Sequence, residues 1–175
     1  MIENNSSPVA NLPNILTLCN IIMGLGAIIT TAHGNFTLAG LLIITGAFFD
    51  RLDGQVARRY SLTSEMGKQL DSLADVITFG IAPAVTIYML SFADTAVLGF
   101  IMIIIFVVSG VYRLARFNTI NFDGAFVGLP ITIAGLLMAL MILFQVKFDF
   151  HPYVIAVGML LISYMMVCKR EIKKV

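Results

Sequence analysis

Four aspartates occupy two nearby segments of the chain at spacings that suit a helix. Asp50 and Asp53 stand three residues apart, and Asp71 and Asp75 stand four residues apart. Residues at either spacing lie on one helix face. The segment between the two pairs contains serine and threonine, which are compatible with a turn. We therefore predict that the two helices fold back antiparallel and that their four carboxylates converge.

Converging carboxylates predict metal chemistry. Two carboxylates about 5 Å apart repel by roughly 3 kcal/mol at an effective dielectric constant of about 20. Two divalent cations would balance four negative charges, and oxygen ligands suit Mg²⁺ or Mn²⁺. Because Mg²⁺ is usually held by carboxylates together with substrate phosphate, the cluster indicates a phosphate ester or anhydride as substrate. Arg58, five residues after Asp53, would supply a bidentate donor to that phosphate.

The alternative interpretation is that these aspartates are solvated acids at helix boundaries. For Asp50 and Asp53 taken alone, this alternative and a metal site stay equally open. The four acids together favour a site, because Gly54 and Gly67 stand beside them. Small residues let membrane helices approach closely, and they also leave room for a flat ligand against the backbone.

Composition indicates that these segments belong to an integral membrane protein. The chain has 175 residues, of which 59% are hydrophobic and 12% are charged, and its mean hydropathy is +0.95. Soluble domains carry about 25% charged residues, so a soluble globule and a disordered chain are both excluded. A net charge of +1 gives no sign of nucleic-acid binding. Cys19 and Cys168 lie in apolar stretches, which argues against a disulfide or a zinc site.

The distribution of charge predicts six transmembrane helices in one all-α polytopic domain over residues 1–175. No charged residue occurs in the stretch 4–49, which is long enough for two helices because one span needs about 20 residues. His33, Gly34 and Asn35 mark the turn between them. The first two predicted helices cover 12–31 and 36–60, and the uncharged runs for the other four are 76–93, 95–112, 124–146 and 150–168.

The basic residues predict the orientation of these spans. An even number of spans puts both termini on one side of the membrane, together with the loops after the second and fourth helices. That side would carry ten of the eleven basic residues, and Lys147 alone would lie opposite. By the positive-inside rule, we expect a multi-pass protein of the cell membrane with both termini and the carboxylates on the cytoplasmic side. Residues 1–11 would be a polar N-terminal segment and residues 169–175 a basic cytoplasmic tail.

The segment from Asp50 to Asp75 reads Asp-x2-Asp-Gly-x2-Ala-Arg-x8-Gly-x3-Asp-x3-Asp and resembles the signature of the CDP-alcohol phosphotransferases at every defined position. The resemblance implies six membrane helices and the transfer of a phosphatidyl or similar group from a CDP-linked donor to an alcohol, with release of CMP. It implies that the four aspartates bind metal ions and that Asp75 also deprotonates the acceptor. It further implies a nucleotide and pyrophosphate pocket lined by Gly54, Ala57, Arg58 and Gly67.

Three further motifs resemble the serine-using members of that family. They are P-N-x2-T-x2-N-x3-G at 13–24, Y-R-x2-R-F-N at 112–118 and F-x-G-L-P at 126–130. Members that make phosphatidylglycerophosphate usually carry arginine where Asn20 stands. The resemblance implies CDP-diacylglycerol and L-serine as substrates and a homodimer among membrane lipids. Short bacterial members fit the length of this chain.

Two sets of residues in these motifs have open interpretations. Asn14 and Thr17 would contact the nucleotide, or together with Asn20 they would form hydrogen bonds between membrane helices. Arg113 and Arg116 lie on one helix face and, with Asn118, would bind the carboxylate of serine. Glycerol 3-phosphate or inositol phosphate would attract the same arginines, and both could instead be positive-inside anchors.

Three other classes of membrane protein compete with this interpretation. A divalent cation transporter would also place acids in the membrane, although such sites tend to lie near the bilayer midplane on broken helices. A membrane prenyltransferase also uses Asp-rich segments with Mg²⁺, but resembles a longer bundle. A purely structural protein would leave the cost of clustered carboxylates unexplained.

Overall fold

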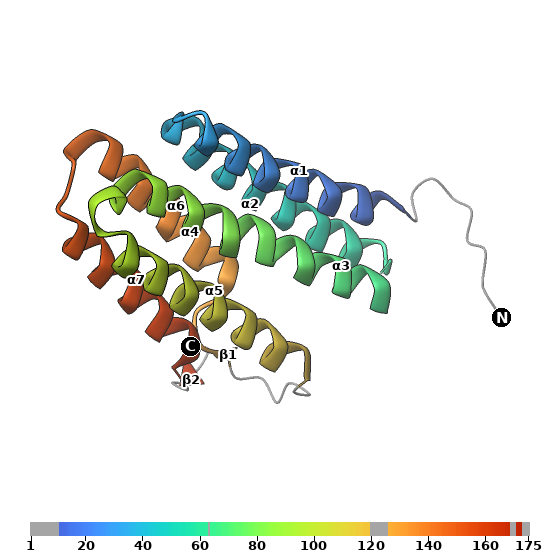
Figure 1. Ribbon diagram of the computed structural model, residues 1–175. Helices are drawn as coiled ribbons and strands as arrows, with labels where there is room; N and C mark the ends of the chain where they lie inside the picture. Colours follow the sequence, from blue (N-terminus) through green and yellow to red (C-terminus); the bar gives the residue numbers. More distant parts are fainter. Residues whose placement is uncertain (1–10, 63, 120–125, 169–170, 173–175) are drawn as a thin grey trace.

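The computed structural model describes residues 11–62, 64–119, 126–168 and 171–172, which form a bundle of long helices (Figure 1). The helices are α1 (Leu12–Ala32), α2 (Phe36–Arg59), α3 (Glu65–Asp75), α4 (Ala82–Ser91), α5 (Ala96–Thr119), α6 (Ile131–Phe148) and α7 (Pro152–Val167). The π-helical turn η2 (Val76–Ile81) joins α3 to α4 in one continuous rod. The 3₁₀ turn η3 (Ala93–Thr95) precedes α5, and the strands β1 (Phe126–Val127) and β2 (Glu171–Ile172) pair antiparallel.

The architecture confirms the predicted all-α membrane fold. Within the described residues, four helical segments are long and apolar enough to cross a membrane: Leu12–Ala32, Glu65–Ser91, Ala93–Asn118 and Ile131–Phe148. The helix α2 has 24 residues, but its last turns are charged, and α7 is apolar but has only 16 residues. The total of six spans therefore stays a prediction, with α2 and α7 as the other two candidates.

Apolar side chains cover the outside of the bundle, as expected for a protein surrounded by lipid. On α1, Ile22 and Ile29 are each 59% exposed, and on α5 Phe100 is also 59% exposed. The small and polar residues of α1 face the other helices instead, and the buried ones are Pro13, Thr17, Asn20, Gly24, Ala27 and Thr31. The polar face of α1 therefore points into the protein.

The predicted turn at residues 33–35 is present. Gly34 takes φ = +75°, a left-handed conformation that glycine adopts without steric cost. Asn35 caps α2, because its Oδ1 accepts a hydrogen bond of 3.1 Å from the main-chain N–H of Leu38. As a result α1 and α2 run antiparallel and side by side (Figure 1).

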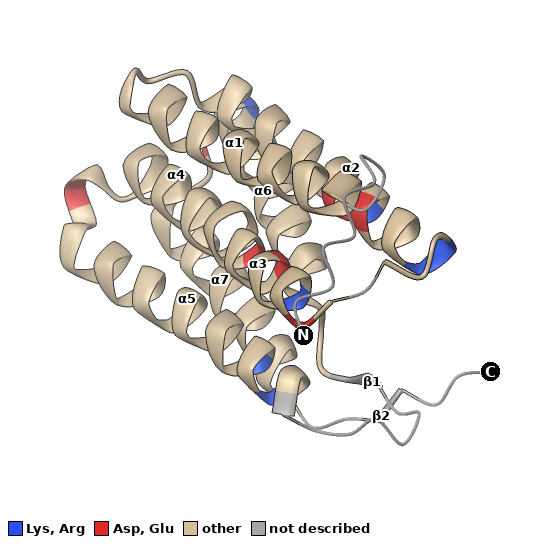
Figure 2. Cartoon of the chain, turned by 90° about the vertical axis from the view of Figure 1, so that its right-hand side faces the viewer, with Lys and Arg blue, Asp and Glu red and all other residues tan. Residues whose placement is uncertain are grey.

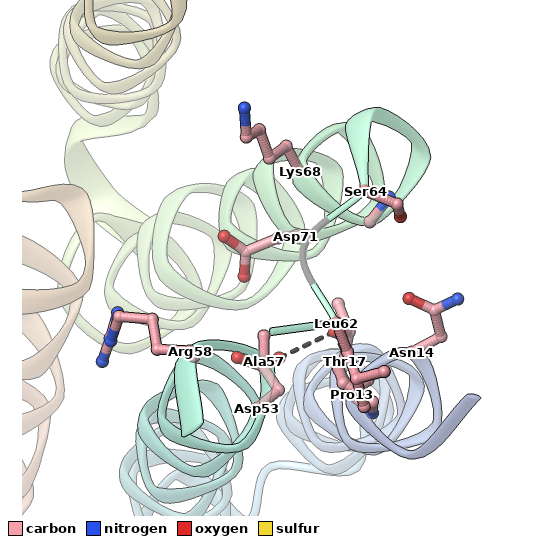
Figure 3. A pocket seen from close by; sticks show the side chains of 12 residues that line it. Pro13, Asn14, Thr17, Asp53, Ala57, Arg58, Leu62, Ser64, Lys68 and Asp71 are labelled. Atoms are coloured by element: carbon pink, nitrogen blue, oxygen red, sulfur yellow. Dashed lines mark hydrogen bonds between the residues drawn. The ribbon is translucent and has the colours of Figure 1, made fainter. Parts of the chain in front are cut away.

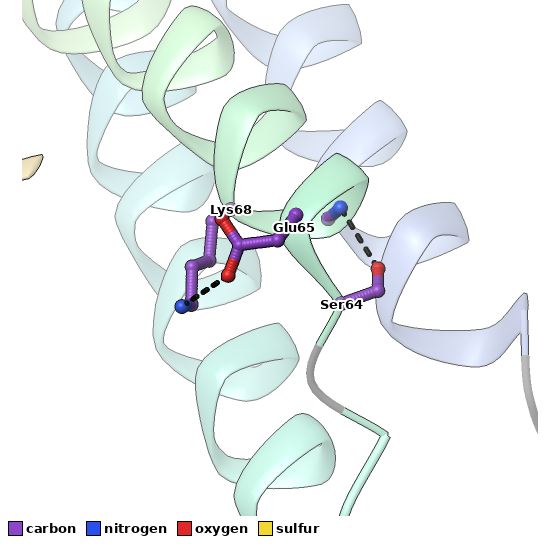
Figure 4. A network of polar contacts seen from close by, with 4 residues as sticks. Ser64, Glu65 and Lys68 are labelled. Carbon is purple, nitrogen blue, oxygen red and sulfur yellow. Dashed lines mark hydrogen bonds and ion pairs between the residues drawn. The ribbon is translucent and has the colours of Figure 1, made fainter.

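The third helical rod begins at Glu65, before the predicted run 76–93. Ser64 is its N-cap, since the Ser64 Oγ accepts a hydrogen bond of 2.9 Å from the main-chain N–H of Gly67. Lys68 Nζ lies 2.8 Å from a carboxylate oxygen of Glu65 in the first turn (Figure 4). Capping by Ser64 and the pairing of Lys68 with Glu65 stabilise this polar first turn. The uncharged run 76–93 therefore underestimates the length of the helix.

The helix predicted from the run 124–146 also begins elsewhere, at Ile131. Gly128 takes φ = +82°, and Pro130, which lacks an N–H group, is the N-cap of α6. These two residues end an extended connection rather than continue a helix. Parts of three predicted segments lie outside the described residues. They are residues 1–10 of the polar N-terminal segment, residues 124–125 of the run 124–146, and residues 169–170 and 173–175 of the basic tail.

The π-helical turn η2 contacts three glycines from three other helices. A Cβ atom at Gly24 of α1 would lie 2.5 Å from Thr78 Oγ1, and one at Gly46 of α2 would lie 2.6 Å from Thr78 Cγ2. A Cβ atom at Gly135 of α6 would lie 2.5 Å from the Cβ of Phe79. Real side chains do not tolerate such separations, so this glycine clamp (Gly24, Gly46 and Gly135) holds η2 and the end of α3 that precedes it.

Charged residues gather at one end of the bundle, as Figure 2 shows. The C-terminal ends of α2 and α5 and the N-terminal end of the α3 rod meet there. This charged end carries Asp50, Asp53, Arg58, Arg59, Lys68, Asp71, Asp75, Arg113 and Arg116. The antiparallel fold therefore assembles at one place the residues that the sequence separates.

Candidate active site

Three of the four predicted metal-binding aspartates lie close together on α2 and α3. Asp50 and Asp53 lie one turn apart near the end of α2, and Asp71 belongs to α3. Each offers a carboxylate oxygen, and these three atoms lie within 4.8 Å of one another. Asp53 is only 4% exposed, and Asp50 and Asp71 are half-buried. The predicted convergence of these three carboxylates is therefore present.

Asp75 joins the cluster through Asp50. The carboxyl groups of Asp50, Asp71 and Asp75 are close enough to repel one another electrostatically. Asp75 is half-buried as a residue, but its Oδ1 atom is buried and has no hydrogen-bond partner in the described part of the chain. An oxygen of Asp71 has the same property. Both atoms are acceptors that a ligand could use.

Two threonines from other helices contact the cluster. Thr17 of α1 donates a hydrogen bond of 2.7 Å from its Oγ1 to Oδ2 of Asp53, and Thr132 of α6 lies close to the Asp50 carboxylate. Sequence analysis left Thr17 open between a nucleotide contact and a hydrogen bond to another helix, and its bond to Asp53 is of the second kind. Thr132 was not predicted, because its place beside Asp50 depends on how α6 packs against α2.

A cavity of about 180 Å³ lies beside the cluster, between the ends of α1, α2 and α3. In Figure 3, Asp53 and Asp71 reach into it from two different helices, and Lys68 points away. The residues that line it are Pro13, Asn14, Thr17, Asp53, Gly54, Ala57, Arg58, Leu62, Ser64, Gly67, Lys68 and Asp71. All six residues predicted to contact nucleotide or pyrophosphate are among them, whereas Pro13, Leu62, Ser64 and Lys68 were not predicted.

The two predicted glycines give the cavity its walls. A Cβ atom at Gly67 would lie 3.4 Å from Oδ1 of Asn14, so α3 approaches α1 closely at this point. A Cβ atom at Gly54 would lie 3.4 Å from Nη1 of Arg58, which places the guanidinium group over Gly54. The missing side chains therefore leave space for a ligand next to a cation.

The three predicted acceptor-binding residues lie near the end of α5. Arg113 interacts electrostatically with Asp75, and its Nε atom is buried without a hydrogen-bond partner among the described residues. Arg116 is half-buried one turn later. Asn118 is exposed and donates a hydrogen bond of 3.0 Å from Nδ2 to Oγ of Ser72. Arg113 therefore lies within electrostatic range of Asp75, whereas Asn118 links α5 to α3.

The oxygen atoms of the cluster fit a divalent cation. Two unit negative charges 4.8 Å apart repel by about 3 kcal/mol at an effective dielectric constant of about 20. A cation bound by several carboxylates replaces this repulsion with attraction, and carboxylate oxygens are preferred ligands of hard divalent ions.

This chain is similar in sequence to known proteins whose names state the reaction that they catalyse. The profile of the CDP-alcohol phosphatidyltransferase family matches residues 10–168. CDP-diacylglycerol–serine O-phosphatidyltransferase of Bacillus subtilis (strain 168) is 37% identical over 159 residues, which are 90% of this chain and 87% of the relative. The protein of the same name from Helicobacter pylori (strain ATCC 700392 / 26695) is 34% identical over 169 residues, 90% of this chain and 71% of the relative.

An archaeal relative extends the comparison. Archaetidylserine synthase of Methanothermobacter thermautotrophicus is 35% identical over 157 residues, which are 87% of this chain and 67% of the relative. The family profile includes every described helix and the whole aspartate segment. The resemblance inferred from the motif at residues 50–75 is confirmed: the chain belongs to the CDP-alcohol phosphatidyltransferase family.

Proposed function

We propose that this protein is an enzyme that transfers the phosphatidyl group of CDP-diacylglycerol to the hydroxyl group of L-serine, giving phosphatidylserine and CMP. The observation that carries this proposal is the match, over 90% of the chain, to relatives named CDP-diacylglycerol–serine O-phosphatidyltransferase. In the reaction the serine oxygen bonds to the phosphorus atom that carries diacylglycerol. The bond between that phosphorus and the oxygen of CMP breaks, and the hydroxyl proton passes to a base.

Asp75 is the proposed base. Serine hydroxyl is a weak nucleophile at neutral pH, so removing its proton during attack accelerates the reaction. The buried Oδ1 of Asp75 has no described partner, which leaves a lone pair for that proton.

Asp50, Asp53, Asp71 and Asp75 are the proposed ligands of two Mg²⁺ or Mn²⁺ ions. When bound, such ions polarise phosphoryl oxygens and stabilise charge on a departing phosphate. The hydrogen bond from Thr17 to Asp53 orients one ligand. Partners of this kind commonly fix ligand geometry at metal sites.

The cavity beside the cluster is the proposed site of the cytidine nucleotide and its pyrophosphate. Its two glycines leave room for a flat group against the backbone, and Arg58 supplies a cation for the phosphates. Asn14, Thr17 and Ala57 complete the proposed contacts. The acyl chains of the donor would lie along the apolar outer surface of the bundle, among membrane lipids.

The proposed acceptor site is formed by Arg113 and Arg116, with Asn118 as a third member. The buried Nε–H group of Arg113, which has no partner among the described residues, is suited to the carboxylate of serine. Because Arg113 interacts with Asp75, a serine bound there would have its hydroxyl group near the proposed base. The hydrogen bond between Asn118 and Ser72 joins the acceptor helix to the metal-binding helix.

The membrane arrangement proposed for the enzyme has six spans in one domain. Both termini and the active site would face the cytoplasm, because ten of the eleven basic residues then lie on that side. We also propose a homodimer in the cell membrane.

A release assay tests the function. Purified protein would receive CDP-diacylglycerol, Mn²⁺ or Mg²⁺, and one acceptor at a time: serine, glycerol 3-phosphate or inositol phosphate. We expect CMP release with serine and none after chelation of the metal. Release with another acceptor alone would contradict the serine assignment. Uptake of Mn²⁺ into vesicles without CMP release would point to a transporter.

A further inference from the structure

The side chain of Asn20 is buried in the membrane-embedded part of the bundle without hydrogen bonds. Asn20 is 0% exposed, and within the described residues neither its Nδ2 nor its Oδ1 has a partner. Burying an amide in this way is unfavourable. Sequence analysis left open a hydrogen bond from Asn20 to another membrane helix, and its side chain makes none among the described residues.

The surroundings of Asn20 place its amide against α2. The Oγ1 of Thr78 donates a hydrogen bond of 3.0 Å to the main-chain oxygen of Asn20. A Cβ atom at Gly46 would lie 3.0 Å from the Asn20 Oδ1. Asp50 follows Gly46 by four residues, so both lie on the same face of α2. The amide therefore packs against the face of α2 that carries a carboxylate one turn away.

The contact between Thr17 and Asp53 provides the register. Thr17 donates to Asp53 across the antiparallel pair α1 and α2. Three residues further along α1 is Asn20, and three residues back along α2 is Asp50. In an antiparallel pair these two steps run in the same direction, each about 4.5 Å long at about 1.5 Å per residue. Asn20 therefore stands at the level of Asp50, as Thr17 stands at the level of Asp53.

We propose that the Asn20 amide is a positioning group that donates a hydrogen bond to the Asp50 carboxylate when Asp50 binds a divalent cation. This inference rests on the proposed metal-binding role of Asp50. A carboxylate that ligates a metal is usually held by hydrogen bonds from neighbouring side chains. Thr17 does this for Asp53, and Asn20 is the buried donor on the same face of α1 that has no described acceptor.

Metal affinity tests the proposal without using activity. Mn²⁺ binding to the purified full chain would be followed by the loss of the electron paramagnetic resonance signal of free Mn²⁺, without substrates. We expect Asn20→Leu, which removes the donor at similar volume, to weaken binding by roughly 10–100-fold. Asn20→Thr, which restores a short donor like that of Thr17, should recover most of this loss. Thr31→Val is the matched control, because Thr31 is a buried α1 residue paired with Thr86, and it should bind Mn²⁺ as the wild type does.

A second measurement covers the case in which Asn20→Leu does not fold. The protein would be labelled with ¹⁵N-asparagine, and the side-chain NH₂ signal of Asn20 would be assigned by its absence from the spectrum of Asn20→Thr. This signal should shift on addition of Mg²⁺. An unmoved signal would overturn the inference, and so would equal weakening by the Leu and Thr variants. If the wild type binds Mn²⁺ and Asn20→Leu binds it equally well, the inference fails and the metal site stands. If the wild type binds no Mn²⁺, both fail.

Discussion

Two sites with buried polar side chains, Gln145 at one end of the bundle and the aspartate cluster at the other, differ in how their hydrogen bonds are satisfied. At the end away from the carboxylates, Gln145 is 3% exposed. Its Oε1 accepts a hydrogen bond of 2.9 Å from the main-chain N–H of Phe150, and its Nε2 donates one of 3.1 Å to the Phe150 oxygen. At the charged end, buried oxygens of Asp71 and Asp75 lack described partners.

This difference sets Gln145, a structural polar group, apart from the aspartates of the proposed site. Gln145 fastens the end of α6 to the turn after it, where Asp149 takes the left-handed conformation with φ = +46°. Its amide nitrogen and amide oxygen both have hydrogen-bond partners within the protein, which leaves little capacity to bind a ligand. The unsatisfied groups at the charged end keep that capacity, at a cost in stability. We expect substitutions at the two ends to separate activity from stability.

The largest effect on activity is expected for Asp75→Asn. The amide retains the shape of the carboxyl group but cannot accept a proton from serine. Loss of a general base costs roughly 10²–10⁴-fold in rate, so CMP release should fall by that amount. Asp94→Asn, at an exposed acid in η3 away from the carboxylates, should leave the rate unchanged. Normal turnover by Asp75→Asn would remove this residue from the mechanism.

A large effect confined to one substrate is expected for Arg113→Ala. A hydrogen bond to a charged group contributes about 1.5–3 kcal/mol, so the KM for serine should rise roughly 10–100-fold. The KM for CDP-diacylglycerol should change little. Steady-state rates with each substrate varied in turn distinguish these outcomes. Equal increases in both constants would contradict an acceptor site at Arg113.

A smaller effect is expected for Thr17→Val, which removes the hydrogen bond to Asp53 and preserves shape. The concentration of Mn²⁺ that gives half-maximal CMP release should rise roughly 10-fold, and excess metal should restore the rate. Thr30→Val is the control on the same helix, because Thr30 bonds only to main-chain oxygens of α1 in the described structure. A defect in Thr17→Val that excess Mn²⁺ does not correct would argue against a role in orienting a ligand.

The smallest effect on activity and a clear effect on stability are expected for Gln145→Leu. The substitution removes the two hydrogen bonds between Gln145 and the main chain of Phe150, each of which contributes about 0.5–1.5 kcal/mol. Thermal unfolding in detergent, followed by circular dichroism, should show a lower Tm. Activity per folded molecule should match the wild type. A loss of activity at unchanged Tm would erase the proposed distinction between the two ends.

Local features of this protein could be predicted from sequence, and contacts between distant helices could not. The turn at Gly34 and Asn35 was predictable because glycine and asparagine suit its geometry. The meeting of Asp50, Asp53 and Asp71 was predictable because helical spacing and one reversal of direction are enough to produce it. Thr132 was missed because its contact with Asp50 depends on how α6 packs against α2.

Helix boundaries show the same limit. The absence of charge located the apolar middle of the rod that contains η2, but capping by Ser64 determined where it begins. The start of α6 was displaced by the conformation of Gly128 and by Pro130. The π-helical turn itself has no charge or periodicity signal, since it arises where the helix meets three glycines at once.

That turn also separates the rod into two independently oriented parts. A π-helical turn closes its hydrogen bonds over one more residue than an α-helical turn, so it rotates the helix after it by roughly 100° relative to an uninterrupted helix. The residues of α4 can thus pack against α6 and α1 while Asp71 faces Asp50 and Asp53 of α2. Deleting one residue from η2 would turn either the ligands or the packing surface away from its partner. We therefore expect insertions and deletions to disrupt the protein more in these six residues than in the connections between helices.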